Sequence, residues 1–246
     1  MIVLRRAQER RHELAGGQAI WHTFALERGG TDVLSAGFGA LEGLSEACLV
    51  PGGDSSPCGP TDAELVTYVA DGAVVRHEPP GRSRVVQCGE FGHLAFARGD
   101  QLSDANASLS IPARIFWLQF RSPAPGYSCP RENRRFTAAE RNGNFRVVAS
   151  PDGRQASLQM GQSVLVFSAL LDRGHHVVHG LLEGRMAWLH IVGGTGVFGE
   201  LVLSEGDGVG LANERAVAFT AEEPSELMLV DLPDQAFPLW SAAVEP

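Results

Sequence analysis

A thiol and two carboxylates lie close together in residues 52–68, whose sequence is GGDSSPCGPTDAELVTY. Cys58, Asp62 and Glu64 carry donor atoms of the kinds that bind metal ions, and a thiol can also act as a nucleophile or a redox sensor. Acidic neighbours disfavour the reactive thiolate form, and Asp54 adds a third carboxylate to this stretch. We therefore interpret Cys58 as an ordinary cysteine, with a redox-active cysteine as the alternative.

Histidines gather in a second segment, residues 174–184, whose sequence is GHHVVHGLLEG. In an extended strand His175 and His179 point to one face, while His176 points to the other. His190 follows on the next expected strand and is a candidate to join them. Imidazoles brought together in this way suit a transition metal such as zinc. We favour exposed or hydrogen-bonded histidines here, and a metal site in this half of the chain is the alternative.

The elements that must position these residues are short strands. Residues 64–96 read ELVTYVADGAVVRHEPPGRSRVVQCGEFGHLAF, in which apolar runs are broken by turn residues at 71–72, at 79–82 and around Gly89. Turn residues recur about every 8 to 12 positions, which is the spacing of an all-β sandwich or barrel. The abundance of glycine, 29 residues, suits many strands joined by tight turns. The sequence therefore predicts an all-β protein.

The strand pattern stops once and then restarts, which predicts two halves. Residues 123–143 are polar and irregular, with room for a short helical turn at 137–141. Strand-like runs resume afterwards, and ADGAVV in the first half has a counterpart in VGGTGVF in the second. Such weak duplication is typical of tandem copies of one barrel. We expect a barrel in 1–122, a connector in 123–143, a second barrel in 144–233 and a tail in 234–246.

Composition excludes several classes of function. The formal net charge of −9 argues against a partner bound through nucleic-acid phosphates, because such binding needs a basic face. No apolar stretch is long enough for a signal peptide or for a membrane span of about 20 residues, so we expect a cytoplasmic protein without membrane contact. The four cysteines form no C-x-x-C pair, which favours free thiols over structural zinc or disulfides.

Several phrases in order resemble the pirin family of bicupins. IVLRRAQER and WHTFAL stand near the start, VVASPDGRQASLQM follows the connector, and MAWLHIVGGTGVFG and SELMLVDLP stand in the second half. The resemblance implies two jelly-roll-like barrels packed face to face. It also implies one metal, usually iron, in the first barrel, bound by an H-x-H pair and a later H-x-E pair. Many family members resemble quercetin 2,3-dioxygenases, and others are described as redox-responsive partners of transcription factors.

The residues at the four inherited ligand positions differ from the family pattern. Counted from Glu64, which matches the family's glutamate just before the strand, the H-x-H pair falls on Cys58 and Pro60. The H-x-E pair falls on Leu102 and Asp104. Because the side chains of proline and leucine cannot ligate a metal, we predict that the inherited metal site is lost.

No shift of register restores the missing imidazoles. The sequence has no histidine between His22 and His77, and none between His93 and His175. An H-x-H pair cannot therefore precede the strand that begins at residue 64, nor can a histidine stand in the segment around residue 102.

A rebuilt site is the alternative to a lost one. The donors available nearby are Cys58, Asp62, Glu64, His93 and Asp104. Cys58 and Asp104 inherit ligand positions and are expected to share a cavity, but two ligands are too few for a stable mononuclear site. His93 would have to point into the barrel as well, and a packed or surface histidine is the interpretation that we favour.

These observations predict a metal-free, non-catalytic bicupin with a regulatory or stress-related role. It would bind a small molecule in the vacated cavity or a protein partner, without contacting nucleic acid directly. Flavonol oxygenation is expected to be absent or very weak, because no metal would be present to bind the flavonol. The alternatives are a divergent dioxygenase with iron or another divalent metal in a rebuilt site, and a cysteine-based redox-responsive protein.

Overall fold

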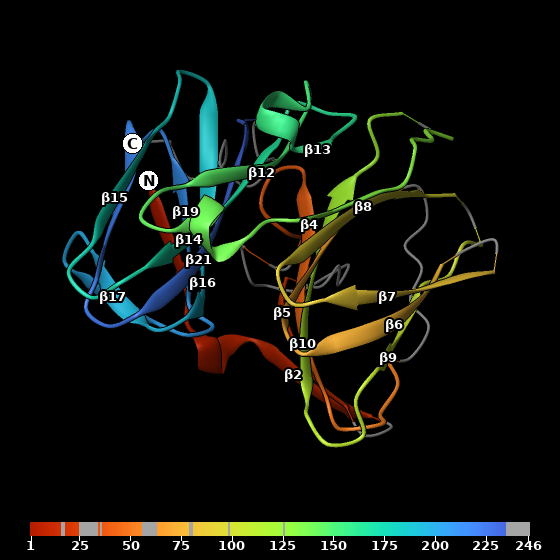
Figure 1. Cartoon of the computed structure of the whole chain (residues 1–246). Helices are drawn as coiled ribbons and strands as arrows, with labels where there is room; N and C mark the ends of the chain where they lie inside the picture. The colour runs from red at the N-terminus through yellow and green to blue at the C-terminus, as the bar shows by residue number, and fades with distance from the viewer. Residues whose placement is uncertain are drawn as a thin grey trace.

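The computed structural model of the chain describes residues 1–15, 18–24, 34, 36–55, 63–78, 81–97, 99–124 and 126–234. They form two β-barrels that lie side by side, so the predicted all-β bicupin fold is confirmed (Figure 1). Among these residues, helical structure is limited to one α-helical turn, α1 (Ala138–Arg141), and two 3-10 turns, η1 (Ala7–Glu9) and η2 (Arg154–Ala156). Within the described ranges, no helix is long and apolar enough to cross a membrane.

The first barrel closes around a large sheet of seven strands and a small sheet of three. The large sheet has the order β11-β8-β5-β10-β4-β3-β2, and the small sheet has the order β7-β6-β9. The strands are β2 (Arg11–Ala15), β3 (Gln18–Phe24), β4 (Leu41–Leu49), β5 (Ala63–Asp71), β6 (Ala73–Glu78), β7 (Arg82–Gln87), β8 (Glu90–Phe96), β9 (Ser103–Asn106), β10 (Ala113–Arg121) and β11 (Glu132–Arg135).

The second barrel repeats this plan with sheets of seven and four strands. Their orders are β1-β19-β16-β21-β14-β12-β13 and β15-β20-β17-β18. The strands are β1 (Ile2–Arg5), β12 (Arg146–Ser150), β13 (Leu158–Gln159), β14 (Leu165–Leu171), β15 (His176–Gly180), β16 (Arg185–Gly193), β17 (Thr195–Phe198), β18 (Leu201–Ser204), β19 (Gly208–Ala212), β20 (Ala216–Ala221) and β21 (Ser225–Pro233).

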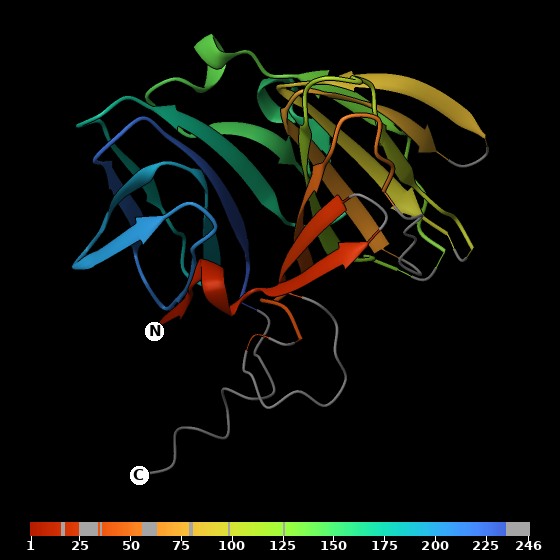
Figure 2. The same cartoon turned by 90° about the horizontal axis from the view of Figure 1, so that it is seen from below.

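Strand pairing links the two halves. β1, at the very start of the chain, pairs with β19 of the second barrel, and Figure 2 shows the N-terminus beside that barrel. β11, within the expected connector, instead pairs with β8 of the first barrel. The domain boundaries expected at 122, 143 and 233 stay a prediction, but each barrel borrows a strand from outside the range first assigned to it.

The large sheet of the first barrel is buried on both faces. Val66 and Tyr68 of β5 belong to a cluster that also contains Trp188 of β16, so these side chains lie between the barrels. Leu65 and Val69 belong to clusters inside the first barrel. The alternation follows from the strand period of two, and double burial explains why β5 reads as an almost continuous apolar run. Even-numbered residues of β5 therefore face the second barrel, and odd-numbered residues face the interior of the first.

Candidate functional site

A buried ion pair lies inside the first barrel. Arg76 of β6 stands opposite Asp104 of β9, and both side chains are fully buried. The guanidinium donates two parallel hydrogen bonds to the carboxylate, with Nε–Oδ1 2.8 Å and Nη2–Oδ2 3.0 Å. Its Nη1 donates to the hydroxyl of Thr67 on β5. The guanidinium thus lies across the barrel interior, between the small sheet and the large one.

The surrounding residues are shaped to hold this pair. Gly92 of β8 has no side chain, and a Cβ there would lie 3.3 Å from Arg76 Nη1 and 2.8 Å from the Thr67 hydroxyl oxygen. The backbone N–H of Asp104 donates to Ser55 Oγ at 2.8 Å, which fixes the strand that carries the carboxylate. A bidentate, fully desolvated pair of this kind costs about 3–5 kcal/mol to break by removal of one partner.

The third inherited ligand position is apolar and packed. Leu102 is fully buried in a cluster with Leu65, Leu94 and Phe96. Its side chain fills space inside the same barrel and offers no donor atom. The loss of the inherited metal site stays a prediction.

The remaining inherited positions, Cys58 and Pro60, lie outside the described residues, as does Asp62. Of the two inherited positions that are described, Leu102 has no ligand atom and Asp104 is already neutralised by a guanidinium. These residues do not fit a divalent cation. Across the described ranges, no group of three or more histidine, cysteine, aspartate or glutamate side chains is arranged to hold a metal ion.

Glu64 and His93, the other donors considered for a rebuilt site, face away from the barrel interior. His93 of β8 lies opposite Val66 of β5, and its Nε2 is 3.1 Å from Glu64 Oε1. Glu64 also accepts from the backbone N–H of Gly161 at 2.7 Å, so it faces the second half of the chain. Because side chains alternate along a strand, Glu64 and His93 lie on one face of the large sheet and Asp104 lies on the other. The hypothesis that His93 points inward and shares a pocket with Asp104 is therefore corrected.

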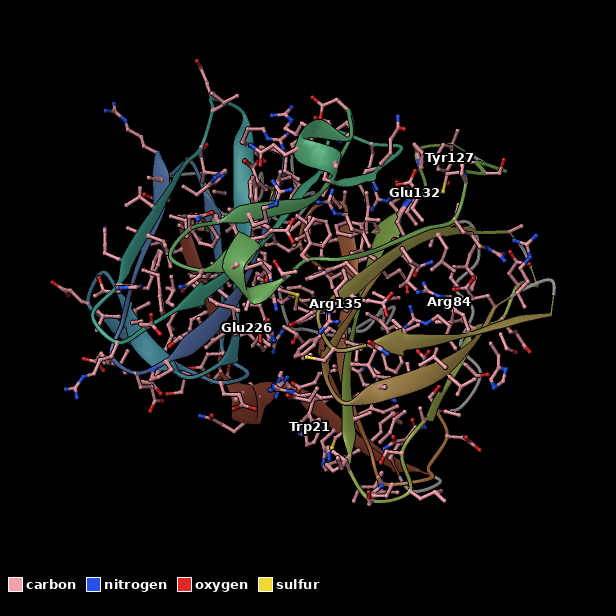
Figure 3. All side chains as sticks on the ribbon, in the orientation of Figure 1. Trp21, Arg84, Tyr127, Glu132, Arg135 and Glu226 are labelled. Atoms are coloured by element: carbon pink, nitrogen blue, oxygen red, sulfur yellow. The ribbon has the colours of Figure 1, made fainter. Side chains whose placement is uncertain are left out.

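Cys129, a free thiol as the cysteine spacing predicts, completes this second cluster. Cys129 Sγ lies 3.7 Å from Nδ1 and 4.0 Å from Nε2 of His93. Burial alone would lower the pKa of His93, but the contacts with Cys129 and Glu64 raise it to about 9. No local motif marks Cys129, because the contact arises from the pairing of β11 with β8. Tyr127 and Glu132, which flank it in sequence, lie together at the rim of the first barrel (Figure 3).

The histidines of the second half do not converge. His175 is exposed, and His176 is exposed with its Nδ1 2.9 Å from Thr220 Oγ1. His179 is half-buried, and its Nε2 lies 2.8 Å from Asp231 Oδ2. The alternative of a second-barrel metal held by His175 and His179 stays a hypothesis, and His179 belongs to no group of three metal-binding side chains among the described residues.

His190 is separated from that group by burial at the barrel interface. Its ring is fully buried and lies edge-on to Phe116 of the first barrel, with centroids 5.8 Å apart. Neither ring nitrogen has a hydrogen-bond partner. Burial is the main cause that lowers the pKa of His190 to about 3, and the charges of Arg10 and Arg114 act in the same direction. His190 is thus a neutral core residue.

A polar network joins the two barrels at another point of their interface. Arg141 Nη1 donates to Tyr68 OH at 3.0 Å, to Ser168 Oγ at 3.2 Å and to Glu226 Oε1 at 2.6 Å. Glu226 appears between the halves in Figure 3. A shallow hollow on the second barrel opens beside this network and is lined in part by Asn142, Leu170 and Glu226.

Comparison with known proteins places these features in context. The family described as the quercetinase C-terminal cupin domain matches residues 147–232. A protein of Escherichia coli K12 named quercetin 2,3-dioxygenase is 29% identical over 233 residues, covering 95% of this chain and 99% of the relative. The pirin-like protein YhaK of the same organism is 27% identical over 206 residues, covering 80% of this chain and 84% of the relative.

Among solved structures, bacterial pirin YhhW from Escherichia coli in complex with nickel(II) superposes with a TM-score of 0.84. It is 29% identical to this chain and covers 95% of it, and the alignment takes in 99% of the YhhW chain. The likeness extends over both barrels. A relative with this fold therefore carries a metal ion. In this chain one of the inherited ligand positions, Asp104, is instead paired with Arg76.

Proposed function

Because the chain belongs to the pirin family of bicupins, we propose that it is a member that has lost the family's metal site and acts by binding rather than by oxygenation. The observation that carries the proposal is the fully buried pair of Arg76 and Asp104. In this interpretation the guanidinium supplies the positive charge that a metal supplies in relatives, and the aspartate at the inherited position neutralises it.

Electrostatics supports exclusion of a metal by Arg76. A guanidinium and a divalent cation about 4 Å apart repel each other by about 8 kcal/mol at an effective dielectric constant of about 20. The carboxylate of Asp104 offsets that repulsion only if it leaves the guanidinium, because both of its oxygens already accept from Arg76. Leu102 adds no donor that would compensate. Activation of a flavonol by a bound metal is therefore not expected.

The binding role has two candidate forms, a protein partner and a small molecule. Leu102 and the Arg76–Asp104 pair occupy part of the described interior of the first barrel, and the hollow beside Glu226 is a candidate site for a small ligand at the surface. The acidic charge of the chain favours a partner other than nucleic acid. We place the protein in the cytoplasm, in a regulatory or stress-related role.

The alternatives have unequal support. A dioxygenase with a rebuilt site lacks a ligand set among the residues that the structure describes. A cysteine-based redox role has one observation in its favour, the contact of Cys129 with His93.

The test is quercetin turnover in the presence of nickel or iron, with the nickel-binding relative YhhW assayed in parallel. We expect no oxygen consumption above the level without protein. Two variants measure the effect of Arg76 on metal binding. In both, all four inherited ligand positions are changed to the family's residues, and only one of them also carries Arg76→Gln. Metal should bind only when the guanidinium is absent. Metal-dependent turnover by the unaltered protein would refute the proposal.

A further inference from the structure

Cys129 is brought to His93 by the fold. It lies three residues before Glu132, and Glu132 of β11 stands directly opposite His93 of β8. The chain entering β11 therefore passes over the imidazole, with Cys129 Sγ 3.7 Å from Nδ1 and 4.0 Å from Nε2. These distances place the sulfur in contact with the imidazole ring.

Glu64 fixes the imidazole from its other side. Its Oε1 lies 3.1 Å from His93 Nε2, and both side chains are fully buried. The carboxylate is itself held by the Gly161 N–H at 2.7 Å and by Gln162 Nε2 at 3.2 Å. The ring thus has one nitrogen committed to a carboxylate, while the other is the ring nitrogen nearer to a thiol. A nucleophile, a base and a group that orients the base recur in this order in enzymes with activated cysteines.

The charges around the ring favour a cationic imidazole. The contacts with Cys129 and Glu64 outweigh burial and raise the pKa of His93 to about 9, so the ring carries a proton at neutral pH. The ionisable groups that face it are Glu64 from β5, Glu132 from β11, and Cys129 with Tyr127 from the segment before β11. A cation beside a thiol stabilises the thiolate, which is the nucleophilic form.

The thiol is accessible as well as paired. Cys129 is half-buried, so part of the residue is open to solvent. Cys88 provides a contrast within the same molecule, because it is exposed and its thiol donates to the backbone carbonyl of Ala70. Burial of part of its thiol and the nearby charge of Asp71 raise the pKa of Cys88. If exposure alone set the rate of reaction with small reagents, Cys88 would react faster than Cys129. If the charge of His93 sets that rate, Cys129 would react faster.

We propose that Cys129 is a reactive cysteine that small peroxides oxidise, with His93 and Glu64 as the residues that prepare it. The thiolate sulfur attacks one peroxide oxygen, an S–O bond forms and the O–O bond breaks. The sulfur loses two electrons and becomes a sulfenic acid, and the peroxide is reduced. The departing oxygen takes a proton from the His93 imidazolium and leaves as water or an alcohol. This site does not depend on whether the first barrel holds a metal.

The experiment compares the two cysteines in the unaltered protein at pH 6. Iodoacetamide alkylation is followed by peptide mass spectrometry, and hydrogen peroxide treatment is followed by dimedone trapping of sulfenic acid. We expect Cys129 to react about tenfold faster than Cys88 with both reagents, since a cationic imidazole in contact with a sulfur favours its attack as a nucleophile. Equal rates, or faster reaction at Cys88, would overturn the proposal without bearing on the metal content of the protein.

Two variants separate activation by His93 from simple accessibility. His93→Gln should slow alkylation of Cys129 about tenfold at pH 6 and leave the rate at Cys88 unchanged. Glu64→Gln keeps the size of the side chain and should move the pH profile of Cys129 alone. A chelator should leave the rates as they are. A rate at Cys129 that rises on chelation would identify the cluster as metal ligands and contradict the proposal.

Discussion

The buried pair of Arg76 and Asp104 can be tested by a double-mutant cycle. Asp104→Leu leaves a guanidinium buried without its counter-ion, and Arg76→Met leaves a buried carboxylate and the Thr67 hydroxyl without their donor. Each single change is expected to lower the free energy of unfolding by about 3–5 kcal/mol. The double variant removes both charges together and should cost much less than the sum of the two, because apolar residues of similar volume replace buried ion pairs at little cost.

The magnitude follows from the geometry. Both side chains are fully buried, and the pair has two parallel hydrogen bonds, so neither charge can turn to solvent when its partner is removed. For a chain of this size, 1 kcal/mol shifts the melting temperature by about 2–4 °C, so each single variant should melt about 6–20 °C lower. The coupling between the two sites should be several kcal/mol.

The assay is urea unfolding of the four proteins, followed by circular dichroism at constant pH and salt. Arg154→Met is a matched control, because Arg154 forms an exposed pair with Asp152 at the surface of the second barrel. Its loss should cost far less than either core change, because solvent screens an exposed pair. Additive effects of the two core variants, or single effects as small as that of the control, would refute the view that a strong internal pair occupies the barrel.

Two predictions concern pH. The pKa of His190 falls from 6.5 to about 3 on folding, because the ring is buried without a partner. The unfolded state therefore binds the extra proton first, and stability present above pH 6.5 should be lost as the pH falls toward 3, by up to about 5 kcal/mol. His190→Leu should flatten this loss in urea unfolding at graded pH, and an unchanged slope would contradict the assignment. The pKa of His93 rises to about 9 on folding, so its contribution is complete below pH 6.5 and is lost as the pH rises through 9, by about 3 kcal/mol. His93→Gln should remove that alkaline loss, and its persistence in the variant would assign it to another group.

The sequence predicted the fold class well because its signals are local. Turn residues at 71–72 and the apolar run beginning at Leu65 mark strands without knowledge of their partners. The expectation that Leu102 cannot ligate a metal also needed only its side-chain type. By contrast, the role of Arg76 depends on the register of β6 against β9, which places it opposite Asp104, and no single-strand pattern reveals that register.

The cysteine site shows the same limit. The burial of His93 agrees with the interpretation of a packed histidine, and strand alternation turns the ring toward the second barrel with Glu64 rather than inward, as a rebuilt site would need. Cys129 reaches it only because β11 crosses back to pair with β8. Cys58 stands out in the sequence because it occupies an inherited ligand position, and it lies outside the described part of the chain. The pairing of strands that are distant in the sequence determines which cysteine contacts a histidine. Composition and local motifs do not reveal that pairing.

The most direct test of the central claim is the metal content of the protein. The purified chain is saturated with nickel(II) or iron(II), freed of unbound ions and analysed by mass spectrometry, with the nickel-binding relative YhhW treated identically. The guanidinium of Arg76 in the first barrel predicts far less than one ion per chain, while the relative retains its metal. One tightly held ion per chain, lost on substitution of Asp104 but not of His179, would contradict the account.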